Sequence, residues 1–347
     1  MIIVHVLFNL RTGGTETMLI DIMNRQKEVG HEVHLMLINA GHQEELLDNL
    51  TSGVGVHRLN RPVGSKNPLW LLRYNRALSA LRPDVVHVHN KQALGMLYGP
   101  RRYKVVFTYH CNGDVNRYAG RADLLCAISQ AVAADVRGRG EGEPVVVYNG
   151  IDTSAVPRRD SSRPLGSPVR VVQIGSLKHM VKGQHIALRA LSAMKHSDVS
   201  FDFYGEGASR PMLESLAREL GVDSRVRFLG NRSRHELYGS LPSYDIAMLP
   251  SLDEGFGLAL VEPMAAGIPV VCSALAGPLE VLAAAGTGVS AGVGDAEALA
   301  AALDGIIDNY GQHLAEAAHA VGAIASDFDI RSTAGRYLEI YRSLNSF

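Results

Sequence analysis

The chain has 347 residues, of which 46% are hydrophobic and 20% are charged, and its formal net charge is −1 at pH 7. This length favours two domains of about 150 residues each, and the balanced charge gives no reason to expect a nucleic-acid partner. Cys111, Cys126 and Cys272 have neither zinc-site spacing nor the even number of a disulfide framework, which favours a reducing compartment. Without a signal segment or a run of about 18 apolar residues, we expect a cytoplasmic protein with no membrane span.

The N-terminal half alternates short apolar runs, rich in β-branched residues, with amphipathic helical patterns. Strands are expected at residues 2–8, 31–38, 56–59, 84–90, 103–109, 124–129 and 144–149. Helices are expected at residues 16–29, near 44, and at 68–81 and 130–137. Near-continuous apolar strands separated by helices are typical of a parallel sheet covered on both faces, so this half is predicted to be a doubly wound α/β domain.

Residues 152–168 are rich in Pro, Ser and Arg, show no apolar period, and are interpreted as a linker. The alternation then restarts, with strands expected at 169–177, 199–207, 225–230, 244–251, 269–273 and 287–292, and helices between and after them. The sequence therefore predicts two similar Rossmann-like α/β domains, residues 1–157 and 165–329, that face a central cleft.

Ligands of parallel sheets bind beyond the carboxyl ends of the strands, so residues at those ends are candidates. After the first strand, Gly13 and Gly14 would let the backbone approach a ligand at a helix start, although a plain turn is the alternative. The dinucleotide fingerprint G-x-G-x-x-G is absent, which argues against a dehydrogenase.

Two further strand ends lie in the second domain. Lys182 precedes a helix and could reach a phosphate there, although a solvated lysine is the alternative. Phe228, Leu229 and Gly230 end a strand with an apolar face and backbone groups that suit a flat base edge. The following residues also read as an ordinary capped helix.

Glu254 and Glu262 flank a Gly255-Phe256-Gly257 turn that leads into an apolar helix. About two turns of helix separate the carboxylates, so both are expected on one side, with an anion on the N–H groups between them. Glu254 could merely compensate the helix dipole. Glu262 lies in an apolar stripe, where a buried carboxylate costs several kcal/mol unless it is hydrogen-bonded, and ribose hydroxyls would satisfy it.

Taken in order, these features extend over almost the whole chain. The segments are "GGTE", "VHVHN", "TYH", "VYNGID", "GSLKHMVKG", "YGEG", "FLG", and Glu254 and Glu262 followed by "PMAAGIPVV". The sequence resembles the retaining glycosyltransferases of family 4, which have the GT-B fold of two Rossmann-like domains. The resemblance also implies that the last helix, residues 330–347, crosses back onto the first domain.

The resemblance implies a nucleotide-sugar donor in the second domain. Glu262 would accept hydrogen bonds from the ribose, and Glu254 would hold the donor sugar. Lys182 would bind the diphosphate, and the backbone at the "FLG" segment would meet the base. The implied donor-binding residues are Gly13, Gly14, Ser176, Lys182, Phe228, Leu229, Gly230, Glu254, Gly255, Phe256, Gly257, Leu258 and Glu262.

In the first domain, the resemblance implies that Gly14 approaches the phosphates. His110 would lie near the reacting carbon or the acceptor hydroxyl, and it completes the implied catalytic set with Glu254 and Lys182. Glu16, His87 and His89 are expected near the acceptor. We expect His87 and His89 to point to opposite faces of the sheet, one lining the acceptor site and one in the core, so that they do not readily bind a metal together.

The sequence departs from the family at Ser176, where an arginine is often found. Lys178 or His179 could replace that cation, or the leaving group could rest on Lys182 and helix dipoles. The resemblance implies no metal and no cofactor beyond the sugar-nucleotide substrate. The D-x-D segment 327–329 is interpreted as surface or helix cap.

The predicted function is transfer of a hexose-type sugar, from a UDP-sugar by preference, to a saccharide or lipid-linked saccharide in bacterial cell-surface polysaccharide biosynthesis. A small secondary metabolite is an alternative acceptor, and a sugar-nucleotide epimerase or a non-catalytic sensor is an alternative function. The basic stretch 57–104 could rest on an anionic membrane, or it could be a solvated helix with one core face.

Overall fold

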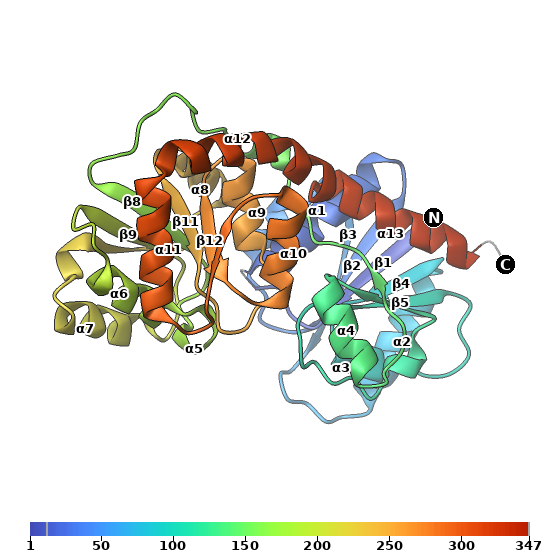
Figure 1. Cartoon of the computed structure of the whole chain (residues 1–347). Coiled ribbons are helices and arrows are strands. Elements are labelled where there is room, and N and C mark those ends of the chain that lie inside the picture. The colour runs from blue at the N-terminus through green and yellow to red at the C-terminus, as the bar shows by residue number, and fades with distance from the viewer. Residues whose placement is uncertain (12, 346–347) are drawn as a thin grey trace. The chain divides into compact units, whose positions relative to one another are not determined.

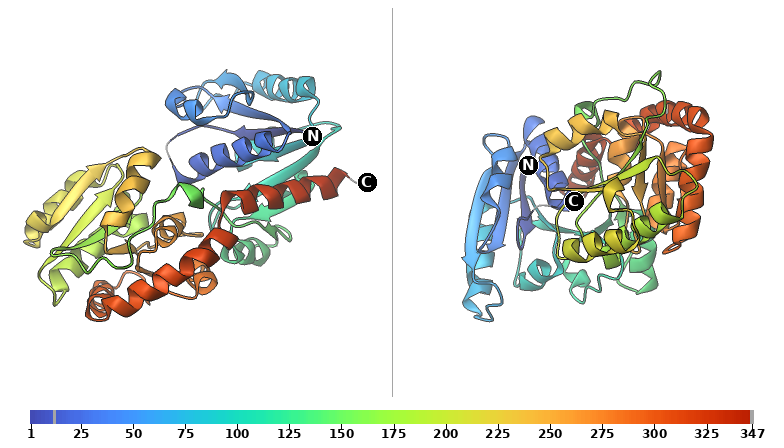
Figure 2. Two further views of the ribbon diagram at one scale, coloured as in Figure 1. Left: turned by 90° about the horizontal axis from the view of Figure 1, so that it is seen from above. Right: turned by 90° about the vertical axis from the view of Figure 1, so that its left-hand side faces the viewer.

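The computed structural model describes residues 1–11 and 13–345. They form two compact units, shown in Figure 1. The first consists of residues 1–150 together with the chain from Ile330 onward, and the second is Ile151–Asp329. Figure 2 shows the sheet of each unit, with its helices, from two further sides.

The first unit is built on a parallel sheet with the strand order β3-β2-β1-β4-β5-β6-β7. Its strands are β1 (Ile2–Leu7), β2 (Glu32–Asn39), β3 (Gly55–Arg61), β4 (Val85–Val88), β5 (Lys104–Tyr109), β6 (Leu124–Ala127) and β7 (Val145–Val146). The order reverses between β1 and β4, which is where ligand sites form in such sheets. The register places His5 of β1 opposite His87 of β4 at this point.

Helices of the first unit pack apolar stripes onto this sheet. They are α1 (Gly14–Glu28), α2 (Leu69–Leu81), α3 (Lys91–Met96), α4 (Gln130–Gly138) and α13 (Ile330–Asn345), with the short helices η1 (Glu44–Asn49) and η2 (Ala119–Arg121). In α1, Met18, Leu19, Ile22 and Met23 recur at helical spacing and are buried.

The final helix α13 belongs to the first unit, although the second unit precedes it in the chain. It lies against α1, and it buries Tyr337 and Tyr341 completely or almost so. The Tyr341 hydroxyl lies 2.6 Å from Nδ1 of His87, and the Tyr337 hydroxyl lies 3.2 Å from Oγ1 of Thr108. Helix α13 therefore supplies polar partners to the interior of the first sheet.

The second unit contains a parallel sheet with the strand order β10-β9-β8-β11-β12-β13. Its strands are β8 (Val169–Ile174), β9 (Val199–Tyr204), β10 (Val226–Gly230), β11 (Ile246–Leu249), β12 (Val270–Ser273) and β13 (Val289–Ala291). Its helices are α5 (His179–Lys182), α6 (Gln184–Ala193), α7 (Arg210–Glu219), α8 (Arg234–Ser240), α9 (Leu258–Ala265), α10 (Ala276–Ala285), α11 (Ala296–Asp308), α12 (Tyr310–Asp327), η3 (Thr153–Ala155), η4 (Asp223–Arg225) and η5 (Leu241–Ser243). The prediction of two doubly wound α/β domains is confirmed.

The expected linker, residues 152–168, packs on the second unit. Arg159 is fully buried, forms an ion pair with Asp245 at 2.9 Å, and donates to the carbonyl of Tyr244 at 2.7 Å. Ile151 forms a parallel bridge with Asp329, so the units divide at Gly150 and not at residue 157. The interpretation of the whole segment as a linker was wrong, because Arg159 is buried against the Asp245 carboxylate and holds the segment on the second unit.

The two aspartates of the D-x-D segment, Asp327 and Asp329, differ in their exposure. Asp327 is exposed, as expected, but Asp329 is only 2% exposed, so it is not a surface residue. Its carboxylate accepts hydrogen bonds from the hydroxyl and the amide of Thr153. Asp329 therefore closes the second unit by joining its last residues to its first.

The part of the chain that the structure describes contains no helix long and apolar enough to cross a membrane.

Candidate functional site

The loop after β8 carries Lys182 in a turn that only glycine permits. Gly183 has a φ of +68°, and a Cβ atom there would lie 1.8 Å from the carbonyl oxygen of Pro250. The amide of Leu252 donates to the carbonyl of Val181 at 2.8 Å. These contacts hold the β8–α6 connection against the loop that follows β11, which carries Glu254.

Lys182 and Glu254 form an ion pair, with Nζ 2.7 Å from Oε2. Their side chains are 24% and 16% exposed, so the pair is partly shielded from water but reachable. The structure thus brings together two of the predicted site residues, which are far apart in the sequence.

A tight turn leads from Glu254 into α9. Gly257 has a φ of +112°, a conformation that favours glycine, and the amide of Leu260 donates to its carbonyl. Phe256 is 2% exposed and packs edge-on against Phe328, with ring centroids 5.4 Å apart. Its side chain therefore anchors the turn. The N-terminus of α9, at Leu258, is the positive end of a helix dipole.

Glu262 lies in the second turn of α9 and is half-buried. Burial raises the pKa of Glu262 to about 7, against the opposing effects of the Arg234 cation and a hydrogen bond with the Tyr238 side chain. Arg234 and Tyr238 are four residues apart on α8, so they lie on one face of that helix. The sequence analysis missed both residues, although their i,i+4 spacing was a readable signal.

The end of β10 is shaped by Gly230, with φ +71°, whose carbonyl accepts from the amide of Gly205 at 2.9 Å. Phe228 stacks on Phe203 with centroids 5.2 Å apart, and its carbonyl accepts from Arg210 at 3.3 Å. Leu229 lies between Phe228 and Gly230 in β10, which is an edge strand of the sheet. Two backbone carbonyls of the segment expected to meet a base, those of Phe228 and Gly230, therefore already have partners in this structure.

The cation expected near Ser176 has two candidates. His179 hydrogen-bonds the hydroxyl of Ser209 through Nδ1 at 2.9 Å, while Lys178 is exposed. The carbonyl of Ser176 accepts from Gln184 at 3.0 Å, which fixes the backbone beside Lys182. Of the two candidates, Lys178 has the more exposed side chain.

In the first unit, α1 begins at Gly14 with Gly13 as its N-cap. Gly14 is exposed, and Oε2 of Glu16 would lie 2.6 Å from a Cβ atom at Gly13. Burial raises the pKa of Glu16. Thr12 lies outside the described residues. The start of α1 therefore combines a glycine turn with a carboxyl group that faces it.

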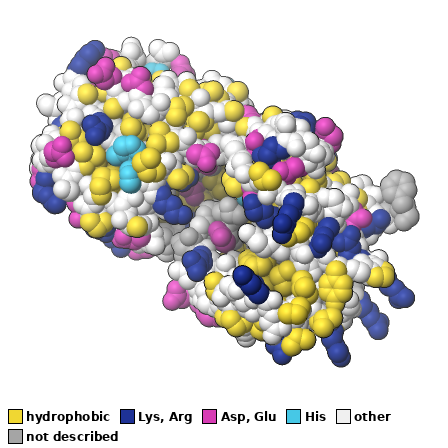
Figure 3. Space-filling model, turned by 90° about the horizontal axis from the view of Figure 1, so that it is seen from below, with side chains coloured by type: hydrophobic (Ala, Val, Ile, Leu, Met, Phe, Trp, Pro, Cys, Tyr) yellow, Lys and Arg dark blue, Asp and Glu magenta, His cyan; other side chains and the backbone are white. Residues whose placement is uncertain are grey.

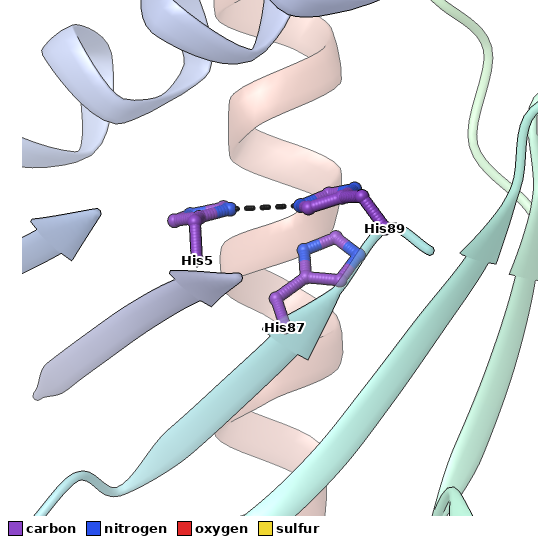
Figure 4. Close-up of side chains that lie close together, drawn as sticks. All are labelled: His5, His87 and His89. Atoms are coloured by element: carbon purple, nitrogen blue, oxygen red, sulfur yellow. Dashed lines mark hydrogen bonds between the residues drawn. The ribbon is translucent and has the colours of Figure 1, made fainter. Parts of the chain in front are cut away.

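His87 and His89 lie on the same side of the sheet, so the prediction that they point to opposite faces was wrong. Residues two apart in a strand share a face, and their ring centroids are 4.1 Å apart. Figure 4 shows both side chains beside His5, which the sequence analysis missed. One ring nitrogen from each of the three histidines lies within 4.8 Å of the others, as in a metal site.

Hydrogen bonds already account for this cluster. His87 contacts Tyr341 through Nδ1 at 2.6 Å and Thr108 through Nε2 at 2.7 Å, which makes it a core residue. His5 and His89 bond each other at 3.1 Å. Since both nitrogens of His87 are engaged, the cluster is satisfied without an ion.

A cavity of about 480 Å³ lies elsewhere in the first unit. It is lined by Lys27, Gly30, His31, Glu32, His34, Gly53 and Gly55. They lie at the end of α1 and at the amino ends of β2 and β3, on the edge of the sheet opposite to the strand ends that carry the candidate site. The cavity therefore lies apart from the strand ends that carry the candidate residues.

The comparisons with known proteins agree across both units. Residues 12–155 match the family described as Glycosyltransferase Family 4, and residues 158–325 match Glycosyl transferases group 1. A glycogen synthase of Mycobacterium tuberculosis is 30% identical over 290 residues, which cover 75% of this chain and 69% of that protein. A D-inositol 3-phosphate glycosyltransferase of Corynebacterium urealyticum is 31% identical over 243 residues, which cover 64% of this chain and 57% of that protein.

Solved structures support the same fold. Anabaena HepE, solved in complex with UDP and glucose, is 22% identical and has a TM-score of 0.83, with 99% of this chain and 100% of that chain covered. This likeness shows the GT-B fold. The chain therefore belongs to the group 1 glycosyl transferases, with a family 4 N-terminal domain, and is a glycosyltransferase.

Proposed function

We propose that the protein is a retaining glycosyltransferase that moves a hexose from a nucleotide-sugar donor to a hydroxyl of a saccharide or lipid-linked saccharide, in bacterial cell-surface polysaccharide biosynthesis. The observation that carries this proposal is the group formed by Lys182, Glu254, Glu262 and the start of α9 in the second unit. A lysine and a helix N-terminus suit a diphosphate, and the two carboxylates suit sugar hydroxyls.

The ion pair between Lys182 and Glu254 has a role in donor binding. Without donor, each charge neutralises the other at 2.7 Å. A diphosphate would draw the ammonium group to itself, and Glu254 would then accept hydrogen bonds from the hydroxyls of the donor sugar. Donor binding would thus exchange one charge-assisted interaction for others, without leaving a bare charge in a partly buried site.

The reaction breaks the bond between the anomeric carbon and the phosphate oxygen, through an oxocarbenium-like state. Lys182 and the start of α9 would stabilise the charge that develops on the departing diphosphate. The acceptor oxygen forms its bond on the same face of the sugar, and its proton passes to a leaving phosphate oxygen. Glu262 would hold the ribose and keep the donor in register. No step requires a metal.

UDP is the favoured nucleotide, and HepE, which shares the fold, was solved with UDP. A thermal-shift screen of the whole protein against UDP, GDP, ADP and TDP tests the choice of base, because a ligand that binds only the folded protein raises its melting temperature. We expect the largest shift with UDP. A larger shift with another nucleotide would reassign the base, and no shift with any of them would contradict the proposal.

The products separate a transferase from the epimerase considered above. With UDP-glucose, a transferase releases UDP in proportion to added acceptor, whereas an epimerase changes the sugar while it stays on the nucleotide. The relatives are named for glycogen and for inositol phosphate. We therefore propose testing an oligosaccharide, a lipid-linked saccharide and inositol phosphate as acceptors, together with a small aromatic alcohol for the secondary-metabolite alternative.

We also propose that α2 rests on an anionic membrane surface. Leu69 and Leu72 are each 55% exposed, and Arg73 and Arg76 are exposed at helical spacing from them. No acidic residue occurs between His57 and Arg82. Figure 3 shows a face of the molecule on which apolar side chains lie beside lysine and arginine side chains. An apolar stripe with basic neighbours is typical of helices at a membrane surface.

The double variant Arg73→Gln and Arg76→Gln is expected to bind vesicles containing phosphatidylserine about thirtyfold more weakly, because each arginine near such a surface contributes about 1 kcal/mol. Sedimentation with vesicles measures this binding. The control variant Arg189→Gln and Arg218→Gln removes the same charge from exposed sites of the second unit. Equal weakening in both variants, or no binding by the unaltered protein, would contradict the docking proposal.

A further inference from the structure

A continuous chain of hydrogen bonds leads from α1 to the end of β5. Nε2 of His5 lies 2.8 Å from Oε1 of Gln26, and Nδ1 of His5 lies 3.1 Å from Nε2 of His89. Nδ1 of His89 in turn lies 3.1 Å from Nε2 of His110. Figure 4 shows the middle link, between His5 and His89. His5 in β1 and the two histidines directly after β4 and β5 are thus joined in series to one glutamine.

The glutamine oxygen gives this chain a direction. A neutral imidazole has one N–H group and one lone pair. Because Oε1 of Gln26 can only accept, His5 must donate from Nε2, which leaves its Nδ1 as an acceptor. His89 must then donate from Nε2 to His5, and His110 must donate from Nε2 to His89. The last free lone pair in the series is on Nδ1 of His110.

The environment keeps all three rings neutral. Burial lowers the pKa of His5 and of His110 to about 4, and burial together with the neighbouring histidines lowers the pKa of His89 well below its ordinary value. At neutral pH each ring therefore carries one proton, and the donor and acceptor roles assigned above hold. His87 stays outside the series, because its two nitrogens bond Tyr341 and Thr108.

We propose that Gln26, His5 and His89 are positioning residues that fix His110 as its Nε2–H tautomer, so that Nδ1 accepts a hydrogen bond from a substrate hydroxyl. Nδ1 of His110 is buried and has no hydrogen-bond partner among the described residues. Buried polar atoms are rarely left unpaired, so this nitrogen is matched to a donor that arrives with a ligand. The identity of that ligand as a sugar or acceptor hydroxyl rests on the proposed function.

This role differs from that of a general base. A ring with a pKa of about 4 does not hold a proton at neutral pH. His110 would therefore orient the hydroxyl, while the hydroxyl proton goes to the leaving phosphate. The reverse tautomer would present an N–H group and could not receive a hydroxyl hydrogen.

The tautomers are measured on the free protein, labelled with ¹⁵N-histidine, by long-range proton–nitrogen correlation at neutral pH. Single His→Gln variants at positions 5, 89 and 110 assign the signals. We expect a protonated Nε2 and a bare Nδ1 in all three rings. A protonated Nδ1 on His110 would overturn the proposal, and this result does not depend on which reaction the enzyme performs.

The variant Gln26→Met removes the fixed acceptor but keeps most of the side-chain volume. His110 is then expected to occur as a mixture of tautomers. The value of kcat is expected to fall about two- to tenfold, in proportion to the fraction that keeps the Nε2–H form. The matched control is Thr108→Val, which removes the hydroxyl that bonds His87 at the same depth in the sheet and should leave the His110 tautomer unchanged.

Two results with the Gln26→Met variant would refute the positioning role. One is an unmixed His110 tautomer in folded Gln26→Met, and the other is a mixed tautomer with unchanged kcat. If Gln26→Met does not fold, the tautomers of the unaltered protein still decide the direction of the hydrogen bonds from Gln26 to His110. If no acceptor is glycosylated by the unaltered protein, the proposed function fails, while the tautomer result stands separately.

Discussion

Replacing Lys182 with methionine is expected to lower kcat about ten- to a hundredfold at saturating donor. The variant keeps the alkyl chain and loses one charge-assisted hydrogen bond to the departing diphosphate, which is worth about 1.5–3 kcal/mol. Glu254 would also lose its partner at 2.7 Å and repel the incoming phosphate. Steady-state kinetics with a nucleotide-sugar donor and the best acceptor measure the effect.

The control for this variant is Lys195→Met, since Lys195 is an exposed lysine of the same unit that lies outside the candidate site. Its kcat should match that of the unaltered protein. A further variant, Lys178→Met, tests whether this exposed lysine replaces the arginine often found at the position of Ser176. An unchanged kcat in Lys182→Met would remove the lysine from the proposed mechanism.

The variant Glu262→Gln is expected to be more stable than the unaltered protein at pH 8 and equal to it near pH 4.5. The folded pKa of Glu262 is about 7, above its ordinary value of 4.5. Between these values the unfolded chain releases a proton that the folded protein keeps, so stability falls as the pH rises through this window. The difference should reach roughly 2–3 kcal/mol above pH 7. Urea unfolding at several pH values measures it.

The same variant should bind the nucleotide more weakly, because a carboxylate accepts two ribose hydroxyls and an amide oxygen accepts fewer. Titration calorimetry with UDP at pH 6 and pH 8 should show the larger loss at pH 8, where Glu262 is ionised. Phosphate titrates at about pH 6, so each comparison is made with the unaltered protein at the same pH. The exposed Glu219→Gln is the matched control. If Glu262→Gln binds UDP as tightly as the unaltered protein at both pH values, ribose binding by Glu262 is contradicted.

The sequence predicted the sheets and the strand-end residues because both depend on local patterns. Runs such as that of β11 are apolar throughout, which is typical of parallel strands buried on both faces. The glycine turns at Gly183 and Gly257 were visible as residues that permit unusual backbone angles. The loops that carry Lys182 and Glu254 follow β8 and β11, which are neighbours in the sheet, so their meeting followed from the topology.

Other features depend on packing between segments that no local pattern connects. The burial of Arg159 requires Asp245. The pKa of Glu262 is raised by burial and is opposed by Arg234 and Tyr238 of α8, so it depends on tertiary packing. His5 read as one residue of an ordinary strand, and Gln26 as a polar residue of α1. Their pairing appears only when the helix lies on the sheet.

Helix α13 has a consequence for how the protein is made. The hydroxyls near His87 and Thr108 come from Tyr341 and Tyr337, which leave the ribosome after all of Ile151–Asp329. The nascent first unit therefore carries buried polar groups without their partners while the second unit is being synthesised. Domains usually fold in the order of translation, but here the unit that emerges first is completed last, so it is the half that depends longer on protection from aggregation.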